Sequence, residues 1–374
     1  MSNYNEYNGI YAFHPGYYVA EFAEELGIKT HELALRLGLS PRIVTLIING
    51  KERITSDISH KLSAMTGTSA ELWLGLQAEY DNNIQQINQE QQLEGQREVE
   101  KGLDYQYFEK VAGLPHTRLW RERIINLCSY LNVSDLRILG KQNIVINFRK
   151  GIKHLDTQKM VNAQAWVQTA VNIARAYPVG VAQLHILEAK LPEIREMTLK
   201  APTEFLPAII RIFKESGVSF ILLPYLKNSC INGAVKWLDN EHVLLAINDR
   251  RCYADTFWFS LFHEIRHILQ KKVQNVFLSC THNDNISSID EELERDADKF
   301  ARDYLIPPKE YAIFEKSNNF LEADIRKFAQ EVHIHPGVLV GRLQHDRHIA
   351  PSQYNQFREK YKIQGRYSGR REEL

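Results

Sequence analysis

Two histidines and a glutamate within residues 255–270 have the types and the spacing of a hydrolytic metal site. His263 and His267 are four residues apart, and Glu264 follows the first of them, in the pattern His-Glu-x-x-His. On a helix, positions i and i+4 lie on one face, so both imidazoles can reach one metal ion. Glu264 lies about 100° further round the helix, where it can take a proton from water at the open side of the ion. The spacing therefore predicts two zinc ligands and a general base.

A third protein ligand is expected from the helical stretch 291–308, which ends at two prolines. Glu294 and Asp298 are four residues apart and share one face. We assign Glu294 as the third ligand, and Asp298 as the carboxylate that orients a ligating histidine through its other ring nitrogen. Asp296 is the rival for the third position and lies on a different face. The alternative is an ordinary acidic helix start, because carboxylates favour a helix N-terminus.

The elements that must position these residues are predicted from the apolar pattern around them. Stretch 255–270 has aromatic and aliphatic residues on nearly every side, which indicates a buried helix. Unpaired polar groups in such a helix cost several kcal/mol, roughly, so its histidines need partners. Stretches 218–223, 232–238 and 242–247 are predicted strands of a small antiparallel sheet, in a zincin-like layout. Stretch 242–247 is the expected edge to which an extended substrate adds; the alternative is a closed core sheet.

These stretches together resemble the ImmA/IrrE family of metallo-endopeptidases. TFWFSLFHEIRHIL followed by ERDADKFARDYLIP is similar to the family's His-Glu-x-x-His helix and its Glu-x-Glu-Ala-Asp/Asn-x-Phe-Ala helix, which ends in Leu-x-Pro. Arg266 stands where members often have Gly, and Asp296 where the second Glu is usual, so which carboxylate binds metal stays open. The resemblance covers roughly residues 210–348. It implies Zn²⁺ as cofactor, with Mn²⁺ as the alternative, and a repressor or toxin–antitoxin protein as substrate.

Residues 1–80 contain a second candidate site, of a kind that binds DNA. Two short helical stretches, 31–37 and 41–48, flank the sequence Gly-Leu-Ser-Pro, in which Gly ends one helix, Ser40 caps the next and Pro41 begins it. Two short helices joined by such a turn form a helix-turn-helix, whose second helix enters the major groove of DNA. The outward-facing residues expected to reach base edges or phosphates are Arg42, Thr45, Asn49 and Lys51.

The net charge of residues 1–80, which we call the head, does not decide whether their partner is DNA or protein. Residues 1–80 carry six Lys or Arg and nine Asp or Glu, a net charge of −3, whereas strong nucleic-acid binders show a basic face. A helical domain that binds only protein is therefore the alternative. The segment 14–81, which begins HPGYYVAEFAEELGIKTHELALRLGLSPRIV, resembles HigA-type antitoxins. These are Xre-class helix-turn-helix repressors, so the resemblance implies operator DNA, a toxin partner and a homodimer.

Length and composition indicate a multidomain globular chain. The 374 residues include 46 basic and 46 acidic residues, and 44% are hydrophobic, so two or three domains are expected. No stretch approaches 18 apolar residues and the N-terminus has no secretion signal, so we expect a cytoplasmic protein without a membrane span. The four scattered cysteines are typical of reduced thiols.

The predicted fold is multidomain, with an all-α helix-turn-helix N-terminal domain, a helical connector and an α+β zincin-like C-terminal metallopeptidase domain. The polar stretch between the head and the connector is expected to be a linker or an exposed helix. The basic residues from Arg358 onward are expected to be solvated. The expected boundaries are 1–80 for the head, 81–101 for the polar linker, 102–205 for the connector, 206–350 for the peptidase domain and 351–374 for the basic tail.

These observations predict a DNA-binding transcriptional regulator, antitoxin-like, with a zinc-dependent endopeptidase domain that cleaves a regulatory protein. His333 or His335 is a candidate to stabilise an oxyanion, although most such histidines are ordinary hydrogen-bonded residues. A second hypothesis is an antitoxin and autorepressor whose metal domain senses or binds a partner without proteolysis. A third is a transcription factor with no toxin partner.

Overall fold

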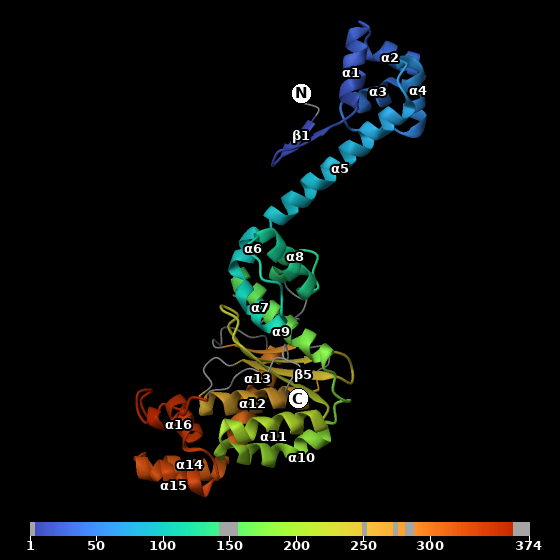
Figure 1. Ribbon diagram of the computed structural model, residues 1–374. Helices are drawn as coiled ribbons and strands as arrows, with labels where there is room; N and C mark the ends of the chain where they lie inside the picture. The colour runs from blue at the N-terminus through green and yellow to red at the C-terminus, as the bar shows by residue number, and fades with distance from the viewer. Residues whose placement is uncertain (1–3, 142–155, 249–252, 272–275, 281–287, 362–374) are drawn as a thin grey trace. The chain divides into compact units, whose positions relative to one another are not determined.

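The computed structural model in Figure 1 describes residues 4–141, 156–248, 253–271, 276–280 and 288–361. The chain divides into two units, Met1–Arg97 and Glu98–Leu374, which we call unit 1 and unit 2. The boundary between the units falls within the stretch that was expected to be a linker. Of the expected basic tail, residues 362–374 lie outside the described residues. Among the described helices, none combines the length and the apolar character that a membrane crossing requires.

Unit 1 is a helical domain that begins with a β-hairpin. Its elements are β1 (Tyr4–Tyr7), β2 (Ile10–Phe13), α1 (Gly16–Glu25), α2 (Thr30–Leu37), α3 (Pro41–Ile48), α4 (Ser56–Thr66) and α5 (Ala70–Glu94). Asn8 and Gly9 join the two antiparallel strands, both with positive φ, as a two-residue hairpin turn requires. The helices enclose a core of apolar side chains that includes Val19, Leu33, Val44, Ile47 and Trp73.

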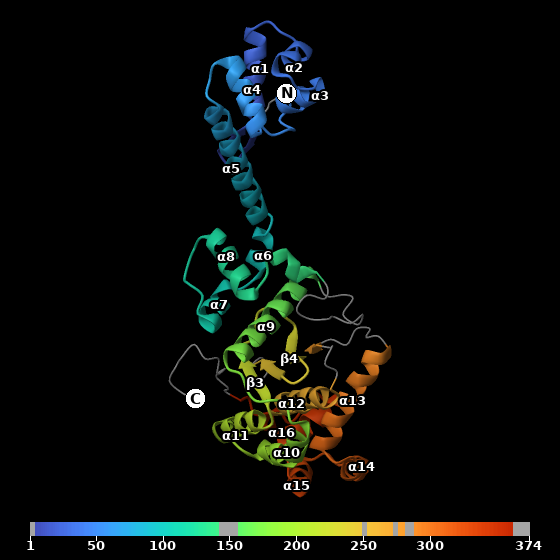
Figure 2. The ribbon, with the colours of Figure 1, turned by 90° about the vertical axis from the view of Figure 1, so that its right-hand side faces the viewer.

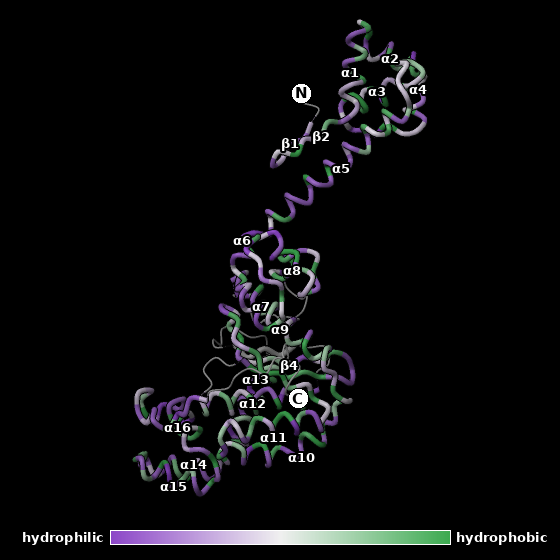
Figure 3. The backbone as a smooth tube through the Cα atoms, viewed as in Figure 1, coloured by the Kyte–Doolittle hydropathy of each residue, from purple (hydrophilic) through white to green (hydrophobic). Residues whose placement is uncertain are grey.

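The polar stretch after residue 80 continues α5 as far as Glu94, and a second helix begins at Arg97. The first half of α5 packs on the core of unit 1 through Trp73 and Leu76. From Asp81 onward its sequence is mostly Asn, Gln and Glu, and Figure 3 shows this part of the helix largely in purple. Of the two expectations for this stretch, a linker or an exposed helix, the structure has a helix.

Unit 2 contains a four-stranded sheet with helices on both faces. Its helices are α6 (Arg97–Gly102), α7 (Tyr105–Ala112), α8 (Trp120–Leu131), α9 (Thr157–Ala176), α10 (Leu184–Glu196), α11 (Pro202–Glu215), α12 (Ala254–Leu269), α13 (Ser288–Leu305), α14 (Pro308–Ser317), α15 (Glu322–Glu331) and α16 (Pro336–His345). Its strands are β3 (Val218–Leu223), β4 (Ile231–Trp237), β5 (Val243–Asn248) and β6 (Val276–Cys280). Three 3₁₀ turns complete it: η1 (Leu136–Gly140), η2 (Met197–Leu199) and η3 (Asn355–Phe357).

The sheet has the strand order β3-β5-β4-β6 and is mixed. β3 runs parallel to β5, while β4 runs antiparallel to both β5 and β6. The expectation of an antiparallel sheet with 242–247 at its edge is therefore wrong. β5 is an interior strand with all six residues buried, and the edges are β3 and β6. The unbroken apolar run of β5 is typical of a strand that is covered on both faces.

Helices cover the two faces of this sheet. α9 contacts β3 and β5, whereas α12 contacts β4, β5 and β6, and Figures 1 and 2 show these helices on opposite sides. Within β5, Val243, Leu245 and Ile247 join the core of α12. On α9, the fully buried Trp166 donates its indole N–H to the Pro224 carbonyl, at 3.0 Å. The expected helical connector thus belongs to unit 2 and supplies one layer of it.

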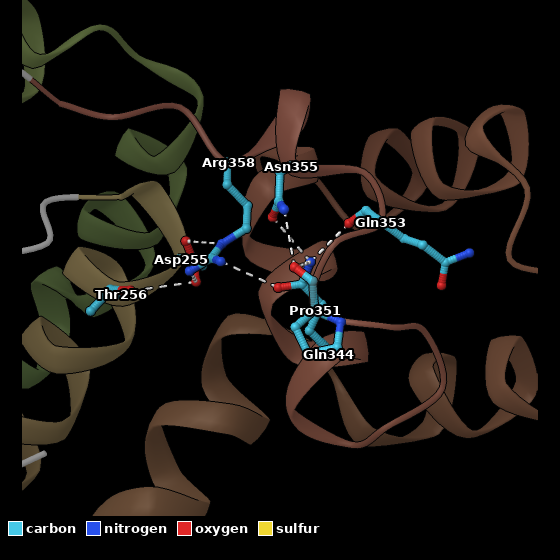
Figure 4. A network of polar contacts seen from close by, with 7 residues as sticks. All are labelled: Asp255, Thr256, Gln344, Pro351, Gln353, Asn355 and Arg358. Atoms are coloured by element: carbon cyan, nitrogen blue, oxygen red, sulfur yellow. Dashed lines mark hydrogen bonds and ion pairs between the residues drawn. The ribbon is translucent and has the colours of Figure 1, made fainter.

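Residues 358–361 pack against the start of α12. Arg358 donates two hydrogen bonds to the Asp255 carboxylate, at 3.0 and 2.8 Å, within the network of Figure 4. The Ala254 N–H donates to the Glu359 carbonyl, at 2.9 Å. The Trp258 indole N–H donates to the buried Tyr361 hydroxyl, at 3.0 Å. The expectation of a solvated tail is therefore wrong for Arg358 and Tyr361, which pack against the first turns of α12, whereas the Lys360 side chain is exposed.

Candidate functional site

The three residues of the His-Glu-x-x-His pattern lie on the buried helix α12. The negative charge of Asp255, in the first turn, interacts favourably with the helix dipole, and no Gly or Pro interrupts the helix. Most of its apolar side chains are buried, and those of Trp258 and Phe262 are fully buried. His263, Glu264 and His267 are buried as well, with 6%, 0% and 1% of their surface exposed. Because buried polar groups need partners, these three side chains must meet groups from other elements.

Glu294 on α13 meets both histidines. His263 Nε2 is 3.2 Å from Glu294 Oε2, His267 Nε2 is 3.3 Å from Glu294 Oε1, and the two Nε2 atoms are 3.0 Å apart. Ligand atoms ~2.0–2.2 Å from a tetrahedral zinc ion lie roughly 3.3 Å from one another. Two imidazoles and one carboxylate are also a donor set of catalytic zinc sites. Within the described residues, these three form the one cluster able to hold a metal ion.

The outer ring nitrogens of both histidines have acceptors. His263 Nδ1 is 2.9 Å from Asp298 Oδ1, and His267 Nδ1 is 2.9 Å from Gln270 Oε1. An ionised carboxylate can only accept, so the Nδ1 of His263 carries the proton. This tautomer leaves the Nε2 lone pair directed at the cluster, which a metal ligand requires. Asp298 therefore lies where the sequence analysis expected the orienting carboxylate.

Asp296, the rival for the third ligand position, has different partners. Its carboxylate accepts hydrogen bonds from Arg266 Nε and Nη2, at 2.7 and 3.2 Å, and from Gln270 Nε2, at 2.9 Å. The structure thus brings Glu294, and not Asp296, to the two imidazoles. Arg266 and Asp296 are the two positions that depart from the ImmA/IrrE pattern, and they contact each other. Gln270 was not singled out in the sequence, although it lies three residues after His267 on the same helix.

Positive charge is favoured among the three converging groups. Burial disfavours a charged His263 imidazole, but hydrogen bonds to Asp298 and Glu294 outweigh it and raise the pKa of His263 above its ordinary value. Burial also disfavours a charged Glu294 carboxylate, yet the two histidines outweigh it and hold the pKa of Glu294 below its ordinary value. Three acceptor atoms in one place attract either a proton or a divalent cation.

Glu264 lies between this cluster and the sheet. Its carboxylate faces Gly233 on β4, where a Cβ atom would lie only 2.6 Å from Glu264 Oε1. Gly233 thus leaves the space that the carboxylate occupies. Sequence reasoning missed this glycine, since nothing near it in the chain indicates which helix covers it.

His333 and His335, the two candidates for an oxyanion role, lie in other surroundings. His333 lines a cavity of about 320 Å³ with Glu196, Leu199 and Lys200. His335 caps α16, because its Nδ1 accepts the Gly337 N–H at 3.0 Å. Neither belongs to the cluster of His263, His267 and Glu294. An oxyanion role for either one has no support from these contacts.

In unit 1, α2 and α3 form two short helices joined by a tight turn. Gly38 ends α2 with φ 60°, a conformation that glycine adopts without strain. Ser40 Oγ accepts the Ile43 N–H at 3.3 Å, and Pro41 is the first residue of α3. Val44 and Ile47 are buried against the core, so the opposite side of α3 faces solvent.

The four residues that were expected to contact DNA are all exposed, and they lie on α3 or just after it. Thr45 Oγ1 donates to the Pro41 carbonyl at 2.8 Å. Nearby, Arg53 pairs with Asp81 at 2.6 Å, so its charge is partly neutralised. Within the described part of the chain, neither Arg42 nor Lys51 has an ion-pair partner. Their charges are available to a phosphate backbone.

Comparison with known proteins relates the N-terminal ~70 residues to regulators. No family model matches the chain. Over 69 residues it is 41% identical to virulence-associated protein A′ of Dichelobacter nodosus, a match that covers 18% of this chain and 60% of that protein. Over 75 residues it is 33% identical to virulence-associated protein I of the same organism, covering 20% of this chain and 69% of that protein.

Two solved structures of HigA proteins are also similar over 22% of this chain. One is the Pseudomonas aeruginosa antitoxin HigA with the higBA promoter, 31% identical over 91% of its length, with a TM-score of 0.21. The other is an addiction module antidote protein of a HigA family from Coxiella burnetii, 33% identical over 91% of its length, also with a TM-score of 0.21. The HTH-type transcriptional regulator YddM of Escherichia coli K12 is 32% identical over 63 residues, which cover 17% of this chain and 67% of YddM. Through its N-terminal segment, the chain belongs to the family of helix-turn-helix transcriptional regulators.

Proposed function

We propose that this protein is a DNA-binding regulator whose unit 2 is a zinc-dependent endopeptidase that cleaves a regulatory protein. One observation carries the enzymatic half of the proposal. Two imidazole nitrogens and a carboxylate from α12 and α13 converge at 3.0 to 3.3 Å, and Glu264 is buried beside them. Family membership of the N-terminal segment supports the regulatory half.

In this proposal His263, His267 and Glu294 hold the ion, and Glu264 handles the proton. When bound, zinc would supply Lewis-acid chemistry, which polarises a peptide carbonyl and makes water more acidic. The Glu264 carboxylate accepts a proton from the attacking water and passes it to the leaving amine nitrogen. Asp298 keeps the His263 imidazole in the tautomer that presents Nε2.

An extended peptide is proposed to reach this site along β6. Among the described strands, β6 lies at the edge of the sheet and pairs with β4 alone, and it contacts α12. An edge strand has unpaired backbone groups to which a peptide can add as a further strand. The side chains of Glu294 and Asp298 are 24% and 43% exposed, so the cluster opens toward α13.

Unit 1 is proposed to place α3 in the major groove of operator DNA. Arg42, Thr45, Asn49 and Lys51 would then contact bases or phosphates. A toxin or repressor is proposed as the protein partner. A homodimer is proposed as the DNA-binding form, because dimeric helix-turn-helix proteins bind two half-sites about one helical turn apart. A cytoplasmic location suits such a regulator.

The variant Glu264→Gln tests the enzymatic half. We expect it not to cleave fluorescein-labelled casein, which the wild type cleaves, while its zinc content equals that of the wild type. Glu292→Gln, the same change at an exposed position of α13, is the matched control and is expected to keep full activity. Unchanged cleavage by Glu264→Gln would rule out this chemistry.

A second candidate function is an antitoxin and autorepressor whose metal site binds a partner without turnover. The observation that favours it is that the similar proteins are described as regulators or antidote proteins. The variant His263→Ala separates the two functions. If operator binding and toxin neutralisation both survive in this variant, proteolysis is not needed for regulation. If regulation is lost together with cleavage, the endopeptidase is the regulatory activity.

A further inference from the structure

Gln270, the residue that follows α12, connects His267 to α13. Its Oε1 lies 2.9 Å from His267 Nδ1. Its Nε2 donates to the Leu293 carbonyl at 3.0 Å and to Asp296 Oδ2 at 2.9 Å. One amide side chain thus has three partners, on its own helix and on the helix that carries Glu294.

The partners of this amide fix its orientation. A carbonyl and a carboxylate can only accept hydrogen bonds, so the NH₂ group of Gln270 must face Leu293 and Asp296. Its oxygen must then face His267. Because this oxygen is an acceptor, His267 Nδ1 must carry a proton, and the Nε2 lone pair points at Glu294 and His263. Rotating the amide by half a turn would place its oxygen against the Leu293 carbonyl and the Asp296 carboxylate, so that acceptor would face acceptor at both contacts.

The ion pair between Arg266 and Asp296 fixes the position of the Gln270 amide. Asp296 Oδ2 accepts from Arg266 Nε at 2.7 Å and from Gln270 Nε2 at 2.9 Å, and Asp296 Oδ1 accepts from Arg266 Nη2 at 3.2 Å. The Arg266 guanidinium also lies over the Phe300 ring, 5.3 Å from its centroid. The two side chains of the pair are 33% and 39% exposed, so they are partly shielded from solvent.

We propose that Gln270 is a positioning residue of the metal site, and that the Arg266–Asp296 pair fixes Gln270. This inference rests on the proposed function, because it assumes that His267 ligates an ion. The two ligating imidazoles are then oriented by different groups, His263 by the carboxylate of Asp298 and His267 by a neutral amide. Arg266 and Asp296, the two residues that differ from the ImmA/IrrE pattern, thus act through Gln270 to set the tautomer of His267.

The test measures zinc affinity and not proteolysis. Full-length protein, stripped of metal, is titrated with Zn²⁺ against a chromophoric chelator, and the visible spectrum of the Co²⁺ form is recorded. Gln270→Met keeps the length of the side chain but removes both the acceptor and the donor. We expect its Kd for Zn²⁺ to rise about 10- to 100-fold, the usual effect of losing a group that orients a ligand. Gln330→Met, the same change at an exposed position near the end of α15, is expected to keep the wild-type Kd and spectrum.

A rescue experiment distinguishes positioning from simple packing. Gln270→Glu alone places two carboxylates against each other and is expected to weaken zinc binding. Adding Asp296→Asn supplies an amide donor to the new carboxylate, which still accepts from His267. The double variant is therefore expected to regain part of the affinity, since the donor to the Leu293 carbonyl stays lost. A wild-type Kd and Co²⁺ spectrum in Gln270→Met, or no recovery in the double variant, would overturn the inference while leaving the proposed function intact. A wild type that binds no zinc would overturn both.

Discussion

The carboxylate of Glu264 on α12 lies directly against Gly233 on β4. A Cβ atom at Gly233 would be 2.6 Å from Glu264 Oε1 and 3.0 Å from its Cγ, closer than non-bonded atoms approach. β4 is irregular at this point, with a register shift between Ile231 and Gly233. The buried Asn248 side chain donates to the Ile231 carbonyl and so holds the strand there. The sheet therefore leaves room for the Glu264 carboxylate at one residue, Gly233.

We predict that Gly233→Ala displaces Glu264 and lowers proteolysis about 10²-fold, since a shift of ~1 Å in a reacting group has effects of that size. Zinc content should stay at the wild-type value, because the three atoms nearest a Cβ at position 233 all belong to Glu264. Gly180→Ala is the control, since a Cβ there meets no atom within 4 Å. Equal rates of casein cleavage in both variants would show that Glu264 does not need this space.

Asp298→Ala is expected to weaken Zn²⁺ binding about 10- to 100-fold, because it removes the acceptor of the His263 Nδ1 proton. Asp303→Ala removes the same charge from the same helix. It is expected to leave the Kd unchanged, since no contact joins it to either histidine. Competition with a chromophoric chelator measures both values. A similar loss in the two variants would mean that general charge, and not the orientation of His263, governs affinity.

In unit 1, Arg42→Ala and Lys51→Ala are each expected to weaken binding to the DNA that precedes the coding sequence. If each side chain contacts a phosphate, the slope of log K against log salt falls by about 1 per substitution. Fluorescence anisotropy at several salt concentrations gives this slope. Arg36→Ala is the control, because Arg36 is paired with Glu32 on α2. Unchanged DNA binding in Arg42→Ala and Lys51→Ala would show that α3 does not contact the DNA.

His14 makes the stability of unit 1 depend on pH. Burial lowers the pKa of His14, opposed only in part by the charge of Asp81 and the backbone of Glu52, and its Nδ1 accepts the Gly16 N–H at 3.0 Å. The folded state therefore prefers the neutral imidazole, while the unfolded chain binds a proton below about pH 6.5. The free energy of unfolding of unit 1 is expected to fall as the pH drops below that value.

Hydrogen exchange of the unit 1 amides, corrected for intrinsic rates, measures this change above and below about pH 6.5. His14→Gln keeps an acceptor for the Gly16 N–H and should flatten the dependence. His31→Gln, at an exposed position of α2, should not. A pH dependence that persists in the first variant would assign the effect to another group.

The sequence predicted the site best where the residues of a motif are spaced along a single helix. The spacing of His263 and His267, and of Glu294 and Asp298, depends only on helix geometry, and both pairs lie on helices with their expected neighbours. The turn before α3 could be predicted for the same reason, since Ser40 and Pro41 act within four residues.

Contacts between distant segments could not be predicted in this way. Nothing local indicates that Arg266 pairs with Asp296, that Gly233 lies under Glu264, or that Tyr361 bonds to Trp258. The β-hairpin at residues 4–13 was overlooked despite its Asn8-Gly9 turn. The misplaced sheet edge has a physical reason too: strand order depends on long-range pairing, and β6 was not anticipated.

The central claim is that one divalent ion is held by His263, His267 and Glu294. Metal analysis of the purified wild type beside Glu294→Ala and Asp296→Ala tests it most directly. We predict one zinc ion per chain in the wild type, loss of the ion in Glu294→Ala, and weakened but measurable binding in Asp296→Ala. A wild type that takes up no zinc, or a Glu294→Ala protein that keeps its full complement, would contradict the account.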